Sequence, residues 1–143
     1  MSSRVRFAYT KAPPDPCATP RLPMILSYKE RFVRATGLLD TGAMVSVLPY
    51  PIGVELGLVW EEQPDFVELT GNLAQLQAKG VVLTAFNPQI TLGGPIYLAF
   101  AWTLSEDIPL ILGHINFLET FNVCFYGKQN FFEVQPITEQ ELP

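Results

Sequence analysis

A single carboxylate stands inside an otherwise apolar run, GLLDTGAMVSVLP, at residues 37–49. Burying an ionised Asp among Leu, Val and Met is costly unless another group stabilises it, so Asp40 needs a partner. The pattern predicts a strand that ends at Leu39, a loop in which Gly42 permits a tight bend, and a second buried strand over VSVL. Taken alone, the Asp-Thr-Gly triplet is also explained by an Asx turn between two strands.

A second apolar segment, LILGHINFL at residues 110–118, contains three aliphatic residues followed by a glycine and a short apolar stretch. The Asp-Thr-Gly-Ala of the first segment resembles the active-site loop of the aspartic proteases, and the alanine after the glycine resembles their retroviral-type branch, the retropepsins. In that family the two segments follow one another in this order. The resemblance implies an all-β protein with one or two short helices, built as a single-lobe retropepsin-like acid-protease barrel that is active as a symmetric homodimer.

The same resemblance implies roles for individual residues. Asp40 would be the catalytic residue, with its loop supported by Thr41 and Gly42. The residues implied to bind substrate are Gly42, Ala43, Gly71, Ile111 and Leu112. A buried β-strand explains Ile111 and Leu112 equally well. No metal and no cofactor are implied.

Direct attack of water on a peptide bond requires two carboxyl groups in one site. One takes a proton from water, and the other, protonated, donates a hydrogen bond to the carbonyl oxygen. The other aspartates, Asp15, Asp65 and Asp107, precede Pro, Phe and Ile, so none repeats the triplet. We therefore expect a twofold homodimer in which two copies of Asp40 share one proton and hydrolyse a peptide or protein substrate. The alternative is a non-catalytic homodimer on the same fold that binds peptides or serves as an assembly module.

The chain departs from the retroviral pattern at two places. Retroviral enzymes carry an acidic residue two positions after the glycine of the triplet and an arginine after the later glycine, and this pair braces the dimer region. Here the positions hold Met44 and His114, so the chain resembles a cellular or bacterial branch with a different interface. The expected flap is a hairpin with arms at 65–69 and 76–85 and with TGNL, residues 70–73, at its tip. It lacks the second glycine of retroviral flaps, and an ordinary surface hairpin is the alternative.

Composition and charge narrow the range of partners. The chain has 143 residues, of which 48% are hydrophobic and 16% charged, as expected for one folded domain with apolar surface to spare for an oligomer interface. The net charge of −5 and the scattered Lys and Arg argue against nucleic acid or a membrane surface as partner. No apolar run has the length of a signal-peptide core or a membrane span, so we expect a cytoplasmic protein in which Cys17 and Cys124 are free thiols. The single histidine, His114, excludes a His-based triad and a histidine-rich metal site.

The residue pattern divides the chain into three parts. These are an N-terminal strand and proline-rich arm (1–23), a retropepsin-like protease domain (24–135) and an acidic C-terminal tail (136–143). Within the domain, alternation and turn residues predict strands at 24–28, 32–39, 89–92, 96–102, 122–126 and 131–134. Short helices are expected at 52–57 and 116–121.

Overall fold

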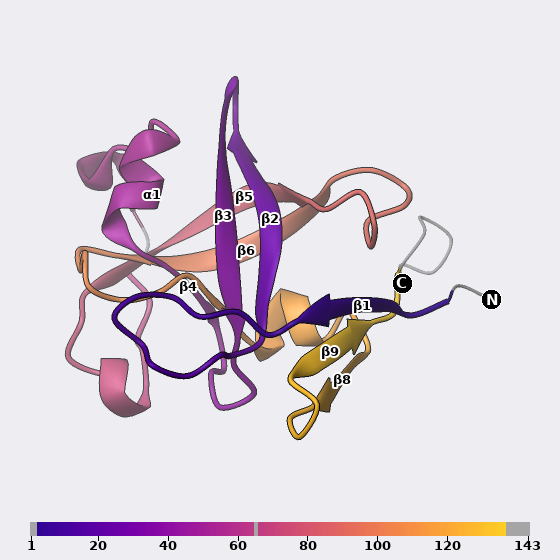
Figure 1. Ribbon diagram of the computed structural model, residues 1–143. Coiled ribbons are helices and arrows are strands. Elements are labelled where there is room, and N and C mark those ends of the chain that lie inside the picture. The colour runs from indigo at the N-terminus through magenta and orange to yellow at the C-terminus, as the bar shows by residue number, and fades with distance from the viewer. Residues whose placement is uncertain (1–2, 65, 137–143) are drawn as a thin grey trace.

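The computed structural model describes residues 3–64 and 66–136. Within these residues, six strands close into a barrel in the order β2-β3-β7-β4-β6-β5, and three strands form a second sheet in the order β1-β9-β8. The barrel strands are β2 (Arg21–Tyr28), β3 (Arg31–Leu39), β4 (Ser46–Leu48), β5 (Ala78–Phe86), β6 (Ile96–Thr103) and β7 (Ile111–Leu112). The second sheet consists of β1 (Val5–Ala8), β8 (Val123–Tyr126) and β9 (Phe131–Val134), and Figure 1 shows it on the opposite side of the barrel from helix α1 (Tyr50–Glu55).

The hairpin of β2 and β3 delivers the Asp-Thr-Gly loop to its place. Along β2, alternate residues Leu22, Met24 and Leu26 are buried in the barrel, which is the period-two pattern of a strand with one face in the core. Lys29 turns the chain into β3 with a positive φ of 53°. Strand β2 begins at Arg21, earlier than the start expected at residue 24, so the end of the expected proline-rich arm is part of the barrel.

The segment before the barrel is also tied to the fold. Strand β1 pairs antiparallel with β9, and the Phe7 ring stacks on Phe132 with the ring centroids 5.3 Å apart. An isolated bridge between Thr10 and Thr19 closes the proline-rich stretch into a loop. Of the acidic tail expected at 136–143, only buried Pro136 belongs to the described residues.

Two expected elements are absent because side chains redirect the backbone. Residues 89–92 form a turn and not a strand, since the Asn87 N–H donates to Thr91 Oγ1 and the Thr91 hydroxyl bonds back to the Asn87 carbonyl. The helix expected at 116–121 is replaced by an irregular turn, η3 (His114–Leu118), in which Asn116 has a φ of 70°. The Asn116 side chain accepts a hydrogen bond from the Ala99 N–H of β6, which accounts for this conformation. Helix α1 overlaps the expected segment 52–57 but begins and ends two residues earlier; Leu56 caps it, and Gly57 follows with a φ of 82°.

Strand β7 is short, but it places the two sequence motifs side by side. It pairs parallel to β3, with Leu39 opposite Leu112, and antiparallel to β4, with Val47 opposite Ile111. The loop that follows β3 is therefore held against the residues that follow β7. In the part of the chain that the structure describes, no helix is long and apolar enough to cross a membrane.

Candidate active site

A cleft of about 530 Å³ opens beside the Asp-Thr-Gly loop. Three parts of the chain line it: the loop after β3 with the start of β4, the segment 68–73, and β7. The segment 68–73 includes the short 3-10 turn η2 (Gly71–Leu73). Asp40 is one of the residues that line the cleft, which brings this carboxylate together with residues that are distant in the sequence.

The Asp40 carboxylate is oriented by its own loop. Its Oδ1 accepts a hydrogen bond from the Gly42 N–H at 2.9 Å, and the Ala43 N–H donates to the Asp40 carbonyl at 3.2 Å. On the other side, the Asp40 N–H donates to the Leu112 carbonyl at 3.1 Å, which anchors the residue to β7. Asp40 is partly exposed, so its carboxylate is fixed in direction while it remains open to the cleft. A carboxylate held in this way can accept a proton from a molecule bound in the cleft.

Two glycines permit the close approach of backbone to backbone and to carboxylate. A Cβ on Gly113 would lie 2.6 Å from the Val45 carbonyl oxygen and 2.8 Å from that of Ala43. A Cβ on Gly42 would lie 3.2 Å from Asp40 Oδ1 and would crowd the carboxylate. The buried Ser46 hydroxyl accepts the Gly113 N–H at 3.1 Å, so this serine supports the crossing of the two motifs from inside the fold.

Most of the residues that the resemblance assigned to the site line the cleft. Gly42, Ala43, Gly71 and Ile111 all do so together with Asp40, whereas Thr41 is exposed and is not among the lining residues.

Leu112 does not line the cleft, and its expected role in substrate binding is wrong. Neighbouring residues of a strand face opposite sides. Ile111 packs with Val47 and Leu69 on the side of the cleft, whereas Leu112 has no exposed surface and packs in the main barrel core with Leu22.

The segment expected to be the flap lies over the cleft but is not a regular hairpin. Among the described residues of this segment, one isolated bridge, Phe66 to Lys79, and one backbone hydrogen bond, from the Val67 N–H to the Ala78 carbonyl, join it to β5. Its tip is the turn η2, with Gly71 at a φ of 65° and with nothing within 4 Å of an added Cβ. Asp65, which was expected to begin the first arm, lies outside the described residues.

Sequence reasoning missed two residues near Asp40. Glu68 lines the cleft, and of the described residues that line it only Asp40 and Glu68 are ionisable. His114, at the position where retroviral enzymes carry an arginine, is exposed, and its Nε2 lies 2.6 Å from the Thr41 carbonyl oxygen. No pattern along the sequence indicates that Glu68 lines the cleft or that His114 contacts Thr41. In both cases the segments involved meet only in the folded barrel.

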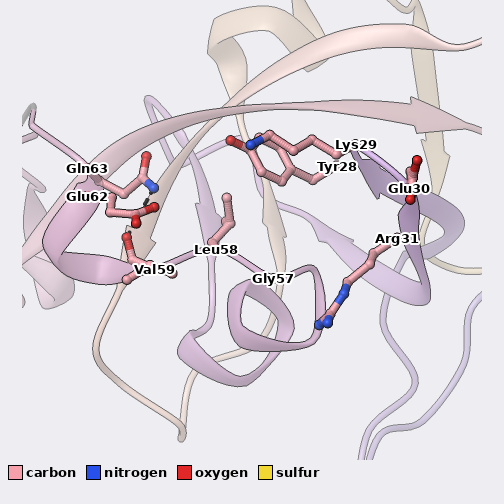
Figure 2. Close-up of a pocket in the computed structure, with 9 residues that line it drawn as sticks. All are labelled: Tyr28, Lys29, Glu30, Arg31, Gly57, Leu58, Val59, Glu62 and Gln63. Carbon is pink, nitrogen blue, oxygen red and sulfur yellow. Dashed lines mark hydrogen bonds between the residues drawn. The ribbon is translucent and has the colours of Figure 1, made fainter.

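A second hollow, of about 340 Å³, lies between the β2–β3 turn and the residues that follow α1. Figure 2 shows the Arg31 side chain running toward Gly57 across this hollow, with Glu62 and Gln63 on its far side. It contains residues of both charges and no residue of either motif. We therefore assign the candidate site to the cleft beside Asp40.

Comparison with known proteins identifies the fold. No protein-family model and no curated protein sequence matches the chain. Among solved structures, the retropepsin-like aspartic protease from Rickettsia conorii aligns with a TM-score of 0.64 and 15% identity, over 95% of this chain and 92% of that one. EIAV protease in complex with the inhibitor HBY-793 aligns with a TM-score of 0.49 and 18% identity, over 77% of this chain and 91% of that one. The Rickettsia structure shows that this chain has the single-lobe retropepsin-like fold, as the two motifs predicted.

Proposed function

We propose that the chain is a retropepsin-like aspartic endopeptidase that works as a twofold homodimer. The observation that carries the proposal is the position of Asp40, which faces the cleft with one oxygen held by the Gly42 N–H and its backbone anchored to β7. A solved protein of the same fold is an aspartic protease. Because one chain supplies one Asp-Thr-Gly loop, the second carboxyl group comes from Asp40 of a second copy.

The two carboxyl groups divide the chemistry of hydrolysis between them. The ionised Asp40 takes a proton from water as the water oxygen attacks the peptide carbonyl carbon, while the protonated Asp40 of the other copy donates a hydrogen bond to the carbonyl oxygen. The first Asp40 then passes the proton it took from water to the amide nitrogen, and the C–N bond breaks as the oxyanion forms the carbonyl of the new carboxylic acid. One ionised and one protonated Asp40 remain, as at the start. Two adjacent carboxylates repel each other, so the pair retains one shared proton and each carboxyl group has a defined role.

The surface beside the loop is suited to contact with a second copy. Met44 and Ile115 are large apolar residues with 60% and 40% of their surface exposed, and the Ile115 N–H donates to the Met44 carbonyl, so the two residues are adjacent. Exposed Thr41 belongs to the same loop. Neighbouring exposed apolar side chains favour burial in an interface. A second chain that covers this surface would bring its own Asp40 toward the first.

The cleft itself suits an extended peptide. Apart from its two acidic residues, it is lined mainly by small and aliphatic residues such as Ala43, Val47 and Ile111. The segment 68–73 closes one side with few backbone hydrogen bonds to the barrel, which is typical of a part that must open to admit a chain. A peptide could place side chains in the apolar parts while its backbone passes Asp40.

The test compares cleavage of a mixed peptide library by the wild type and by Asp40→Asn. Asparagine has nearly the same shape but cannot act as a base, so we expect loss of cleavage by at least about 10³-fold with the fold retained. Asp107→Asn, which changes an exposed aspartate outside the cleft, is the matched control and should cleave like the wild type. Equal cleavage by the wild type and Asp40→Asn would contradict the proposal. A library that binds but is never cleaved would favour the non-catalytic peptide-binding module.

A further inference from the structure

His114 makes a side-chain contact with the loop that carries the carboxylate. Its Nε2 lies 2.6 Å from the carbonyl oxygen of Thr41, the residue next to Asp40. A carbonyl oxygen only accepts hydrogen bonds, so Nε2 carries the proton and donates it. Both the neutral Nε2–H tautomer and the imidazolium have this proton, so the bond is compatible with either state of the ring.

The contact completes a set of hydrogen bonds that hold the loop from one side. The His114 N–H donates to the Ala43 carbonyl at 3.0 Å, and the Ile115 N–H donates to the Met44 carbonyl at 2.9 Å. These two backbone bonds fix the part of the loop after Gly42. The imidazole reaches further back, to Thr41, and so restrains the part between Asp40 and Gly42.

Thr41 lies between Asp40 and the glycine whose N–H orients the carboxylate. It is exposed, and the one hydrogen bond found for its carbonyl among the described residues comes from His114. The Asp40 carboxylate takes its direction from the Gly42 N–H, so rotation of the peptide units on either side of Thr41 would turn the carboxylate as well. A catalytic group that is misplaced by about 1 Å can lose about 10²-fold in rate.

We infer that His114 is a positioning residue: it donates a hydrogen bond from Nε2 to the Thr41 carbonyl and thereby holds the Asp40 carboxylate in its working direction. This inference rests on the proposed peptidase function. It assigns to the single histidine of the chain a role that acts through the loop and not through contact with substrate.

The test compares His114→Leu, which has no donor, with His114→Gln, whose amide N–H can replace Nε2–H. We expect His114→Leu to lower kcat by about 10- to 100-fold with KM changed by less than about threefold, and His114→Gln to retain most of the rate. Glu119→Gln, an exposed change farther along the same turn, is the control and should match the wild type. An unchanged kcat in His114→Leu would overturn the inference. So would an equal loss in both variants accompanied by lower unfolding midpoints, because that pattern indicates a structural role.

A second measurement separates this inference from the proposed function. Hydrogen exchange of the Gly42 amide, which is bonded to Asp40 Oδ1, does not depend on cleavage. We expect this exchange to be faster in His114→Leu than in the wild type and nearly restored in His114→Gln. If the wild type cleaves nothing but this exchange pattern holds, the peptidase proposal fails while the positioning of the loop by His114 stands. Equal exchange in all three proteins would overturn the positioning role even where cleavage is observed.

Discussion

Replacing Gly113 by Ala should disrupt the crossing that holds the active-site loop. The φ of Gly113 is −106°, which any residue can adopt, so the effect comes from space and not from backbone strain. An added Cβ would lie 2.6 Å from the Val45 carbonyl oxygen, 2.8 Å from that of Ala43 and 2.9 Å from the Val45 carbonyl carbon. All three atoms belong to the backbone, so the two segments must move apart.

The expected loss of stability follows from the contacts and hydrogen bonds that this movement disrupts. Overpacking of a tight site costs about 1–3 kcal/mol. Moving the segments apart also loosens the bonds from the His114 and Ile115 N–H groups to the loop, each of which contributes about 1 kcal/mol. We therefore expect Gly113→Ala to lower the free energy of unfolding by about 3–5 kcal/mol, a large share of the about 5–15 kcal/mol of an ordinary domain.

The assay is urea unfolding of the wild type, Gly113→Ala and Gly127→Ala at one protein concentration, because the stability of a dimer depends on concentration. Gly127 is the matched control, since a Cβ there meets nothing within 4 Å. Its replacement should change the free energy of unfolding by less than about 0.5 kcal/mol. If Gly113→Ala is as stable as Gly127→Ala, the close crossing of the two motifs is not required and the reasoning is refuted.

Three further predictions concern the cleft and its chemistry. Leu112→Ala should lower the free energy of unfolding by about 2–5 kcal/mol without changing which peptides are cleaved, whereas Ile111→Val should lower it by only about 0.5–1.5 kcal/mol and change the peptide preference. Urea unfolding and cleavage of a peptide library check both variants. A changed preference in Leu112→Ala but not in Ile111→Val would contradict the assignment of their faces. The ionisable residues found to line the cleft are the acidic Asp40 and Glu68, so peptides with Lys near the cleaved bond should be preferred over peptides with Glu. Glu68→Gln should weaken this preference, and the control Glu61→Gln should not. An unchanged preference in Glu68→Gln would show that Glu68 does not face the substrate. Activity should follow a bell-shaped pH profile that is highest on the acidic side of neutrality. At low pH a second proton removes the base, and at high pH loss of the shared proton removes the acid. A cleavage rate that rises steadily into alkaline pH would contradict the shared proton.

Strands and turns that depend on local residue patterns could be predicted from the sequence. Strands β3, β8 and β9 lie within one residue of their predicted bounds, whereas β2 begins three residues earlier than predicted. In both hairpins a short polar turn between the strands was the sequence signal. The place of Asp40 after β3 follows from the strand pattern and the glycine of its triplet. Asp40, Gly42, Ala43, Gly71 and Ile111 could therefore be proposed together before their shared cleft was known.

The errors occur where contacts across the fold decide the local structure. In β7, Ile111 and Leu112 are both apolar because both faces of the strand are covered, so periodicity cannot show which side chain faces the cleft. The helical spacing after Gly113 is overridden by Asn116, whose side chain satisfies the Ala99 N–H and takes the backbone to positive φ. The bond from His114 to Thr41 joins residues 73 positions apart, and only the crossing of the two motifs brings them together.

The central claim is that each active site needs Asp40 from two copies of the chain, and subunit mixing tests it most directly. Wild type and Asp40→Asn are mixed at constant total concentration, allowed to exchange, and assayed for peptide cleavage, while light scattering checks for a mass of twice 16.0 kDa. If both carboxyl groups are required, mixed dimers are inactive and activity falls with the square of the wild-type fraction, to about one quarter in an equal mixture. If a single Asp40 sufficed, mixed dimers would remain active and the same mixture would retain about one half to three quarters of the activity, which would contradict the account.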